Sequence, residues 1–212
     1  MKTNKLCALT FDDGPDAVKT PRVLDKLEKY KITATFFMIG RQINDDAKSV
    51  IDRIVSMRCE IGNHSWSTDG MAEMARDEIV RSVSDTSAAI RKYSALEPAF
   101  FRPPNLSVSD TLYASIDLPF ASGIVGMDWP SCDTTAEDRA QNVLRDIKDG
   151  AIILLHDNQP DPHPTPEALE ILVPELIKQG YEFVTLSELF ARKGVNANSR
   201  KGDMWVFVGQ PA

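Results

Sequence analysis

The stretch LCALTFDDGP, residues 6–15, joins a short apolar run to a turn that carries two adjacent carboxylates. A run of this length and composition, closed by turn residues, predicts a buried strand. Gly14 and Pro15 end the strand, because glycine and proline interrupt regular structure. The stretch therefore predicts that Asp12 and Asp13 stand at the carboxyl end of a buried strand.

The alternation of an apolar run with a helical pattern continues along the chain. We expect strands at 6–11, 34–40, 60–64, 99–103, 120–127, 151–156, 181–186 and 204–208. We expect helices at 21–30, 47–58, 75–93, 109–116, 136–148 and 166–179, and a short last helix after the strand at 181–186. Such alternation indicates a parallel sheet with helices outside it, and this many repeats favour a closed or nearly closed barrel. The sequence thus predicts one α/β domain over residues 1–212.

Two of the expected helices begin with a threonine followed by a proline. Thr20 precedes Pro21, and Thr165 precedes Pro166. Threonine is a common N-cap and proline suits the first helical position, so we expect both hydroxyls to cap their helices. Pro174 lies inside the second of these helices and is expected to kink it.

The composition bounds the class of protein and of partner. The 212 residues are 42% hydrophobic, enough for one sizeable core, and the formal net charge is −7. This acidic balance argues against a nucleic acid or an anionic membrane surface as partner and suits a neutral or cationic ligand better. The three cysteines are odd in number and widely spaced, so we expect buried apolar thiols rather than a disulfide framework or a zinc knuckle.

The sequence also bears on location. No stretch approaches the ~20 consecutive apolar residues that cross a bilayer, and we expect no membrane partner. Residues 1–10 lack the long apolar core of a secretory leader. Two locations stay open: a catalytic domain excised from, or secreted as part of, a longer protein, and a cytoplasmic protein.

Chemically active side chains follow five of the expected strands. In a parallel barrel the carboxyl ends of all strands meet on one face, where catalytic groups gather. Taken singly, each residue has an ordinary explanation as a turn, a packing residue or an ion pair, but their recurrence at one rim indicates an active site. The residues are Asp12 and Asp13, His64, Arg102, Asp128 and Trp129, and His156 and Asp157.

Four of these segments together resemble a known family. The motifs TFDDGP (10–15), HSWS (64–67), RPP (102–104) and LLHD (154–157) are similar to those of the polysaccharide deacetylase (NodB-like) family, carbohydrate esterase family 4. The resemblance covers about residues 5–193. It implies a distorted (β/α) barrel with parallel strands and outer helices. It also implies metal-assisted removal of acetyl groups from an acetylated polysaccharide or oligosaccharide.

The resemblance implies a role for each matching residue. Asp12 resembles the general base that activates water, and Arg102 the cation that holds this base ionised. Asp13 and His64 resemble the ligands of a divalent metal ion. Hydrolysis at neutral pH needs an activated water, which such an ion supplies by lowering the pKa of water, and the oxyanion needs a cation or N–H donors.

The leaving group needs a proton, and His156 resembles the residue that donates it in the family. Asp133 best matches the acid that partners this histidine, with Asp128 as the competitor. Residues expected to bind substrate are Asn105, Trp129, Leu154 and Trp66.

The metal motif departs from the family at one position. The family places a second histidine four residues after the first, where this chain has Thr68. Asp69 could replace the missing imidazole, directly or through water. A site richer in oxygen would favour Mn²⁺ or Co²⁺ over Zn²⁺, so the ion is expected to be one of these three. Asn105 stands where the family often has tyrosine, and its backbone N–H could still bind the oxyanion.

The function expected from these residues is hydrolysis of acetyl groups on carbohydrates by a metal-dependent enzyme. Acetylated xylan is the favoured substrate, because an ester is easier to cleave than an amide and tolerates a weakened metal site. N-deacetylation of chitin oligosaccharides or peptidoglycan is the alternative. Two further readings stay open: an inactive carbohydrate-binding module with a degenerate metal site, and a metal-free hydrolase of a small cyclic amide.

Overall fold

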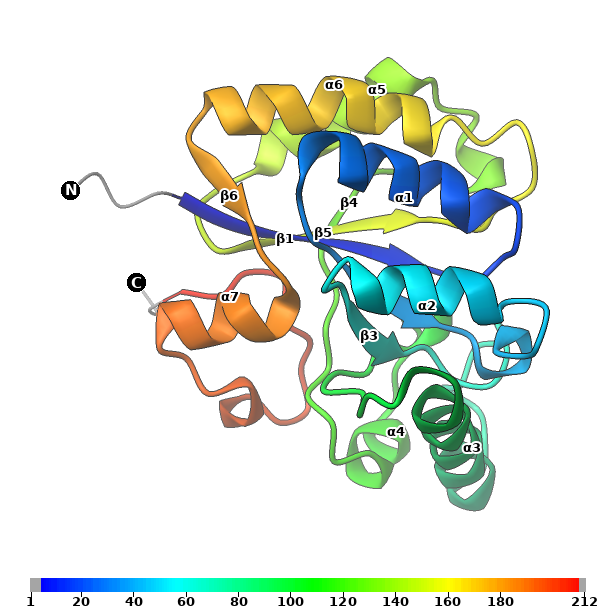
Figure 1. Cartoon of the computed structure of the whole chain (residues 1–212). Coiled ribbons are helices and arrows are strands. Elements are labelled where there is room, and N and C mark those ends of the chain that lie inside the picture. The colour runs from blue at the N-terminus through cyan, green and yellow to red at the C-terminus, as the bar shows by residue number, and fades with distance from the viewer. Residues whose placement is uncertain (1–4, 210–212) are drawn as a thin grey trace.

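The computed structural model describes residues 5–209, in which strands and helices alternate along the chain (Figure 1). The strands are β1 (Lys5–Asp12), β2 (Thr35–Met38), β3 (Glu60–Asn63), β4 (Ile124–Val125), β5 (Ala151–His156) and β6 (Tyr181–Phe183). The α-helices are α1 (Lys19–Tyr30), α2 (Lys48–Ser56), α3 (Arg76–Ser94), α4 (Asp110–Ser115), α5 (Ala136–Asp146), α6 (Thr165–Lys178) and α7 (Leu186–Lys193). Short 3-10 helices lie at η1 (Gly40–Gln42), η2 (Pro104–Leu106), η3 (Pro130–Cys132) and η4 (Ala197–Ser199).

The strands form one parallel sheet in the order β3-β2-β1-β5-β4. β5 pairs with most of β1 and brings His156 opposite Asp12. β2 pairs with the carboxyl-terminal half of β1, and β6 pairs with its amino-terminal half. The parallel register sets the ends of β1, β2, β3 and β5 on the same side, as the rim predicted from sequence requires.

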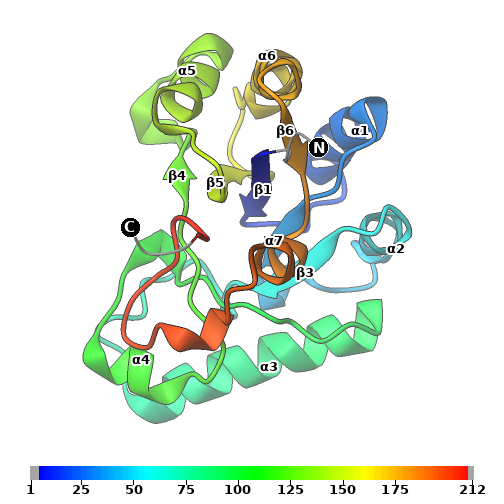
Figure 2. The same cartoon turned by 90° about the vertical axis from the view of Figure 1, so that its left-hand side faces the viewer.

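Isolated bridges close the sheet into a ring. Asn63 at the end of β3 bridges Phe101, and Phe101 bridges Phe120, whose segment continues into β4. The result is the expected distorted barrel of parallel strands with helices outside it (Figure 2). Two predicted strands, at 99–103 and 204–208, form only such bridges, and the one predicted at 120–127 shortens to two residues.

Side chains alternate along β1, as a strand requires. Cys7, Leu9 and Phe11 face the core formed with α1, α2, α5 and α6, whereas Leu6 and Ala8 face a second core. That second core includes residues of α7 together with Trp205. Helix α7 follows β6 and lies next to it in Figure 1. The carboxyl ends of the strands remain free to form a pocket.

The predicted capping by threonine is wrong at both helices. Thr20 lies within the first turn of α1, which begins at Lys19, and Thr165 is the first residue of α6. The two hydroxyls donate instead to buried carboxylates, of Asp157 and Asp128 respectively. An unpaired buried carboxylate costs more free energy than an uncapped helix end, so the tertiary contact prevails. Helix α6 continues through Pro174 to Lys178.

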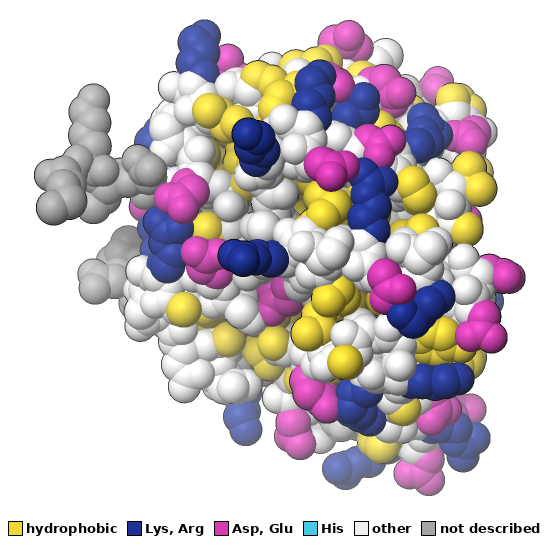
Figure 3. Space-filling view, in the orientation of Figure 1, with side chains coloured by type: hydrophobic (Ala, Val, Ile, Leu, Met, Phe, Trp, Pro, Cys, Tyr) yellow, Lys and Arg dark blue, Asp and Glu magenta, His cyan; other side chains and the backbone are white. Residues whose placement is uncertain are grey.

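The surface carries interspersed charges rather than a block of one sign on the face shown in Figure 3. Within residues 5–209 no helix has the length and apolar content needed to cross a membrane. The three cysteines are free thiols, with Cys7 and Cys59 buried and Cys132 half-buried.

Candidate active site

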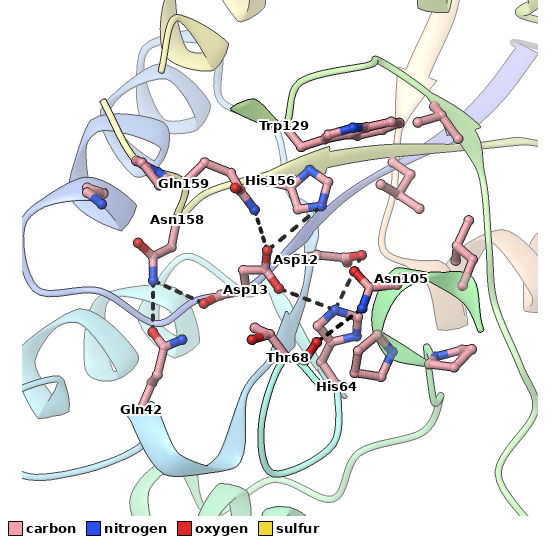
Figure 4. Close-up of a pocket in the computed structure, with 17 residues that line it drawn as sticks. Asp12, Asp13, Gln42, His64, Thr68, Asn105, Trp129, His156, Asn158 and Gln159 are labelled. Carbon is pink, nitrogen blue, oxygen red and sulfur yellow. Dashed lines mark hydrogen bonds and ion pairs between the residues drawn. The ribbon is translucent and has the colours of Figure 1, made fainter. Parts of the chain in front are cut away.

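A cavity of about 690 Å³ opens at the carboxyl ends of the strands (Figure 4). It collects residues from segments that lie far apart in the sequence. Seven of the side chains expected at the site line it: Asp12, Asp13, His64, Asn105, Trp129, Leu154 and His156. Lys19, Gln42, Thr68, Pro103, Pro104, Leu106, Val125, Asn158, Gln159 and Pro160 complete the lining.

Arg102 lies fully buried beneath the cavity and holds Asp12. Its Nη1 atom donates to Asp12 Oδ1 at 2.6 Å and to Thr10 Oγ1 at 2.8 Å. The remaining guanidinium donors reach the carbonyls of Ala121 and Ser122, and the plane stacks 4.1 Å from the centroid of Phe37. A buried charge-assisted pair of this kind orients the carboxylate and leaves Asp12 Oδ2 facing the cavity.

His64 presents a ring nitrogen to two carboxylates. Its Nδ1 atom lies 2.7 Å from the carbonyl of Arg102, which can only accept, so Nδ1 carries the proton. Nε2 then faces Asp13 Oδ1 at 3.5 Å and Asp12 Oδ2 at 3.7 Å. Burial opposes a charge on His64, but the two carboxylates outweigh it and raise the pKa of the imidazole. Two carboxylates beside one imidazole nitrogen form a site whose negative charge suits a cation bound between the three groups.

The donor set fits a divalent metal ion. A carboxylate oxygen and an imidazole nitrogen are ordinary ligands, and a carbonyl on the far ring nitrogen is the usual support of a metal-bound histidine. Asp13 Oδ1 and His64 Nε2 are the two atoms that could bind such an ion. No cluster of three His, Cys, Asp or Glu side chains arranged to hold an ion occurs among the described residues.

The structure does not bring Asp69 to this position, which corrects the prediction that Asp69 replaces the second imidazole as a third protein ligand. Asp69 is exposed, lies outside the cavity lining and accepts a hydrogen bond from Ser67 Oγ at 2.7 Å. In the same loop the carbonyl of Thr68 accepts a hydrogen bond from Asn105 Nδ2 at 3.2 Å. Trp66, also expected at the site, is 43% exposed and is likewise absent from the lining.

His156 is partnered by Asp128, and the choice of Asp133 is wrong. His156 Nδ1 lies 2.7 Å from Asp128 Oδ1, and its backbone N–H donates to Asp128 Oδ2 at 2.8 Å. Because β4 pairs with β5, Asp128, three residues after Val125, lies beside His156, where it is completely buried. Asp133 lies beyond η3 and is exposed.

The pair sets the charge of the imidazole. Burial opposes the charge of His156, but the Asp128 carboxylate and its hydrogen bond outweigh this effect and raise the pKa to about 9. Nε2 is turned toward the cavity, 3.9 Å from Asp13 Oδ2. Trp129 stands edge-on to the ring with 6.3 Å between centroids. At neutral pH the site therefore holds a protonated imidazole facing two carboxylates.

Residues 1–120 match the model of the family described as polysaccharide deacetylase. The chain belongs to this family. A family 4 acetyl xylan esterase from Clostridium thermocellum, solved with a cobalt ion, is 55% identical, with a TM-score of 0.93 over 96% of this chain and 99% of that one. The family match and this 55% identity make the chain a hydrolase of the polysaccharide deacetylase family.

Two relatives with curated names extend the comparison. A bifunctional xylanase/deacetylase from Pseudobutyrivibrio xylanivorans is 46% identical over 93% of this chain and 32% of its own length. The chain thus spans about a third of that relative. A peptidoglycan-N-acetylglucosamine deacetylase from Bacillus cereus is 34% identical over 89% of this chain and 90% of its own length.

Within this family member, two side chains after β5 hold Asp13 in ways the motifs did not reveal. Asn158 Nδ2 donates to the carbonyl of Asp13 at 3.1 Å and to Gln42 Oε1 at 2.8 Å. Gln159 Nε2 donates to Asp13 Oδ2, so only Oδ1 of this carboxylate is turned toward His64 (Figure 4). The signal available in the sequence was their place directly after LLHD at the end of a strand.

Asp157 also holds the loop that carries Asp13 and Gly14. It is buried, and its carboxylate accepts from the backbone N–H of Gly14 at 3.1 Å and from the hydroxyl of Thr20. A Cβ on Gly14 would collide with this carboxylate, so the close approach requires glycine. Burial raises the pKa of Asp157 to about 7.

Proposed function

We propose that this chain is a metal-dependent deacetylase that removes O-acetyl groups from acetylated xylan. The observation that carries the proposal is the meeting of a base, a candidate metal pair and an acid at one cavity. Asp12 is fixed by Arg102, Asp13 faces His64, and His156 is charged by Asp128. The acetyl xylan esterase relative at 55% identity supports the choice of substrate.

Asp13 and His64 would hold the metal ion, with water and substrate in its other positions. Zn²⁺, Co²⁺ and Mn²⁺ are the candidates, and the cobalt ion in the esterase relative favours Co²⁺ as a probe. A bound ion would supply a Lewis acid at the acetyl group and favour ionisation of water. The oxygen-rich environment and the absence of a second imidazole at Thr68 predict loose binding.

Asp12 is the proposed general base. Its Oδ1 atom is occupied by Arg102 at 2.6 Å, while Oδ2 is directed toward His64 and the cavity. Only Oδ2 can therefore accept a proton from the attacking water. The buried guanidinium orients the carboxylate before the reaction, so no reorganisation is needed during the transfer.

His156 is the proposed general acid. Its Nδ1 proton is held by Asp128, and Nε2 is the nitrogen that faces the cavity. Since its pKa is raised to about 9, the ring is protonated at neutral pH and can donate from Nε2 to the sugar oxygen as the ester bond breaks. Trp129, Leu154 and Val125 provide apolar surface beside this nitrogen for the acetyl methyl and the sugar face.

N-deacetylation is the second candidate, favoured by the peptidoglycan deacetylase that matches over 90% of its length. An amide leaving group is poorer than an alcohol, so it places a greater demand on the metal ion. The two candidates are separated by substrate. We also propose that the chain acts as a single catalytic domain of a longer protein, as the bifunctional relative suggests, and that this longer protein is secreted.

The test is acetate release after controlled metal loading. The protein is stripped with chelator, reloaded with Zn²⁺, Co²⁺ or Mn²⁺, and assayed on acetylated xylan, chitin oligosaccharides and peptidoglycan. We expect metal-dependent release that is fastest on xylan. Binding to a polysaccharide without release under any metal would contradict the proposal and favour a carbohydrate-binding module, and release independent of metal would favour a metal-free hydrolase.

A further inference from the structure

Behind the catalytic histidine lies a buried guanidinium to which the mechanism above gives no role. Arg139 on α5 is 3% exposed. Its Nη1 atom lies 2.8 Å from Thr165 Oγ1 and 3.1 Å from His163 Nδ1, and its Nε donates to Thr134 Oγ1 at 3.1 Å. Within the described chain it forms no ion pair with a carboxylate. Burying a charge without a direct counterion costs free energy of folding, which suggests that the hydrogen bonds of Arg139 serve a function.

The first branch of the network ends at Asp128. Thr165 is fully buried, and its hydroxyl has one proton to donate. Arg139 can only donate, so it donates a hydrogen bond to Thr165 Oγ1. The Thr165 hydroxyl in turn donates a hydrogen bond to Asp128 Oδ2 at 2.7 Å. The direction of both hydrogen bonds is therefore determined, and each polarises the other.

The second branch ends at the backbone of His156. Because Arg139 donates to His163 Nδ1, this nitrogen carries no proton, and Nε2 must carry it. Nε2 then donates to the carbonyl of His156 at 2.9 Å. Burial lowers the pKa of His163, in agreement with a neutral ring. The motifs did not single out His163.

The two branches reach both residues of the acid pair. Asp128 divides its oxygens between the His156 ring, on Oδ1, and the His156 backbone and Thr165, on Oδ2. Residue 156 is consequently held at its ring, its N–H and its carbonyl. It is the last residue of β5, where the strand gives way to a loop and the sheet alone no longer orients the side chain.

We propose that Arg139 is a positioning residue for the Asp128–His156 pair, acting through Thr165 and His163. Its task is to keep Asp128 in the rotamer that aims His156 Nε2 at the leaving group. The kinetic reading of this inference rests on the proposed deacetylation. The hydrogen-bond network itself is measurable without substrate, so the two can fail separately.

The kinetic test compares Thr165→Val with Thr165→Ser and with Arg139→Met. We expect Thr165→Val to lower kcat by about 10- to 100-fold with KM and the Kd for Co²⁺ unchanged, the size typical of a lost supporting hydrogen bond. Thr165→Ser should recover most of this loss. In the double variant with Arg139→Met, the combined loss should be smaller than the product of the two single losses, because both changes break the branch that runs from Arg139 through Thr165 to Asp128. Thr185→Val is the matched control, since its hydroxyl caps α7 away from the cavity and should affect only the melting temperature.

The structural test is ¹⁵N NMR of the histidine side chains. The chain has only three histidines, and the structure assigns Nδ1–H to His64 and His156 and Nε2–H to His163. In Thr165→Val we expect the Nδ1–H signal of His156 to shift upfield and exchange faster with solvent, while that of His64 stays in place.

The proposal is overturned if Thr165→Val keeps kcat within twofold of wild type, or if the losses in the double variant multiply. Should Arg139→Met fail to fold, Thr165→Val decides alone, with its melting curve as the check on folding. Should the wild type release no acetate, the proposed function fails and the NMR signal decides the network: a shifted His156 signal supports it and an unchanged one overturns it.

Discussion

His156 Nδ1 lies 2.7 Å from Asp128 Oδ1, and this contact determines which nitrogen and which charge the imidazole offers to the cavity. Substitution of Asp128 by Asn removes the negative charge but keeps the shape. We expect the pKa of His156 in the metal-free protein to fall from about 9, because burial is then opposed only by the charges of Asp12 and Asp13 and no longer by Asp128. NMR titration of the three histidines measures it. Asp133→Asn is the control, and an equal shift in that variant would contradict the pairing.

Asp157 predicts a pH dependence of stability. Its pKa is raised from 3.8 to about 7, so between these values the folded protein binds a proton that the unfolded chain does not. The free energy of unfolding of the metal-free protein should therefore fall as pH rises through this window, by at most about 1.4 kcal/mol per pH unit from this group. Urea unfolding of wild type and Asp157→Asn from pH 4 to 8 isolates the contribution. A difference between them that is independent of pH would contradict the assignment.

Thr68 predicts a gain of function. The residue lines the cavity four positions after His64, where the family places a second imidazole. Thr68→His should tighten Co²⁺ or Zn²⁺ binding by roughly tenfold or more, because a third protein ligand completes the usual catalytic zinc set. Isothermal titration calorimetry measures the change. Asp69→Asn should leave affinity unaltered, and a loss in that variant would restore Asp69 as a ligand.

Gln159 predicts a supporting role for a neutral side chain. Its amide donates to Asp13 Oδ2 and leaves Oδ1 directed toward His64. Gln159→Leu should weaken Co²⁺ binding by about tenfold, the usual effect of losing a hydrogen bond to a metal ligand. Gln179→Leu, at an exposed helix end, is the matched control. Unchanged affinity in Gln159→Leu would show that Asp13 is oriented by the backbone contact of Asn158 alone.

The sequence predicted the barrel and the rim well, because strand ends in a parallel sheet follow directly from apolar runs and turns. It failed where a side chain chose a tertiary partner over a local one. Thr20 and Thr165 were predicted to cap helices, but their hydroxyls donate to buried carboxylates. The carboxylate lies more than a hundred residues away in the sequence for Thr20 and about forty for Thr165. No local pattern carries that information.

The choice between two acids failed for the same reason. Asp128 and Asp133 flank one short segment, and only the pairing of β4 with β5 decides that the first of them is buried beside His156. Arg139 and His163 were missed because a single Arg on a helix and a His in a loop have no signature until the fold brings them together.

The central claim is that Asp12 acts as base while Asp13 and His64 hold the metal ion. It is tested most directly by measuring Co²⁺ binding and acetate release from acetylated xylan for Asp12→Asn and Asp13→Ala in parallel. Asp12→Asn should keep its Co²⁺ affinity within a few-fold and lose about 100-fold or more in kcat, as expected for removal of a general base. Asp13→Ala should lose Co²⁺ binding and activity together. Turnover by Asp12→Asn near the wild-type rate, or full Co²⁺ affinity in Asp13→Ala, would contradict the account.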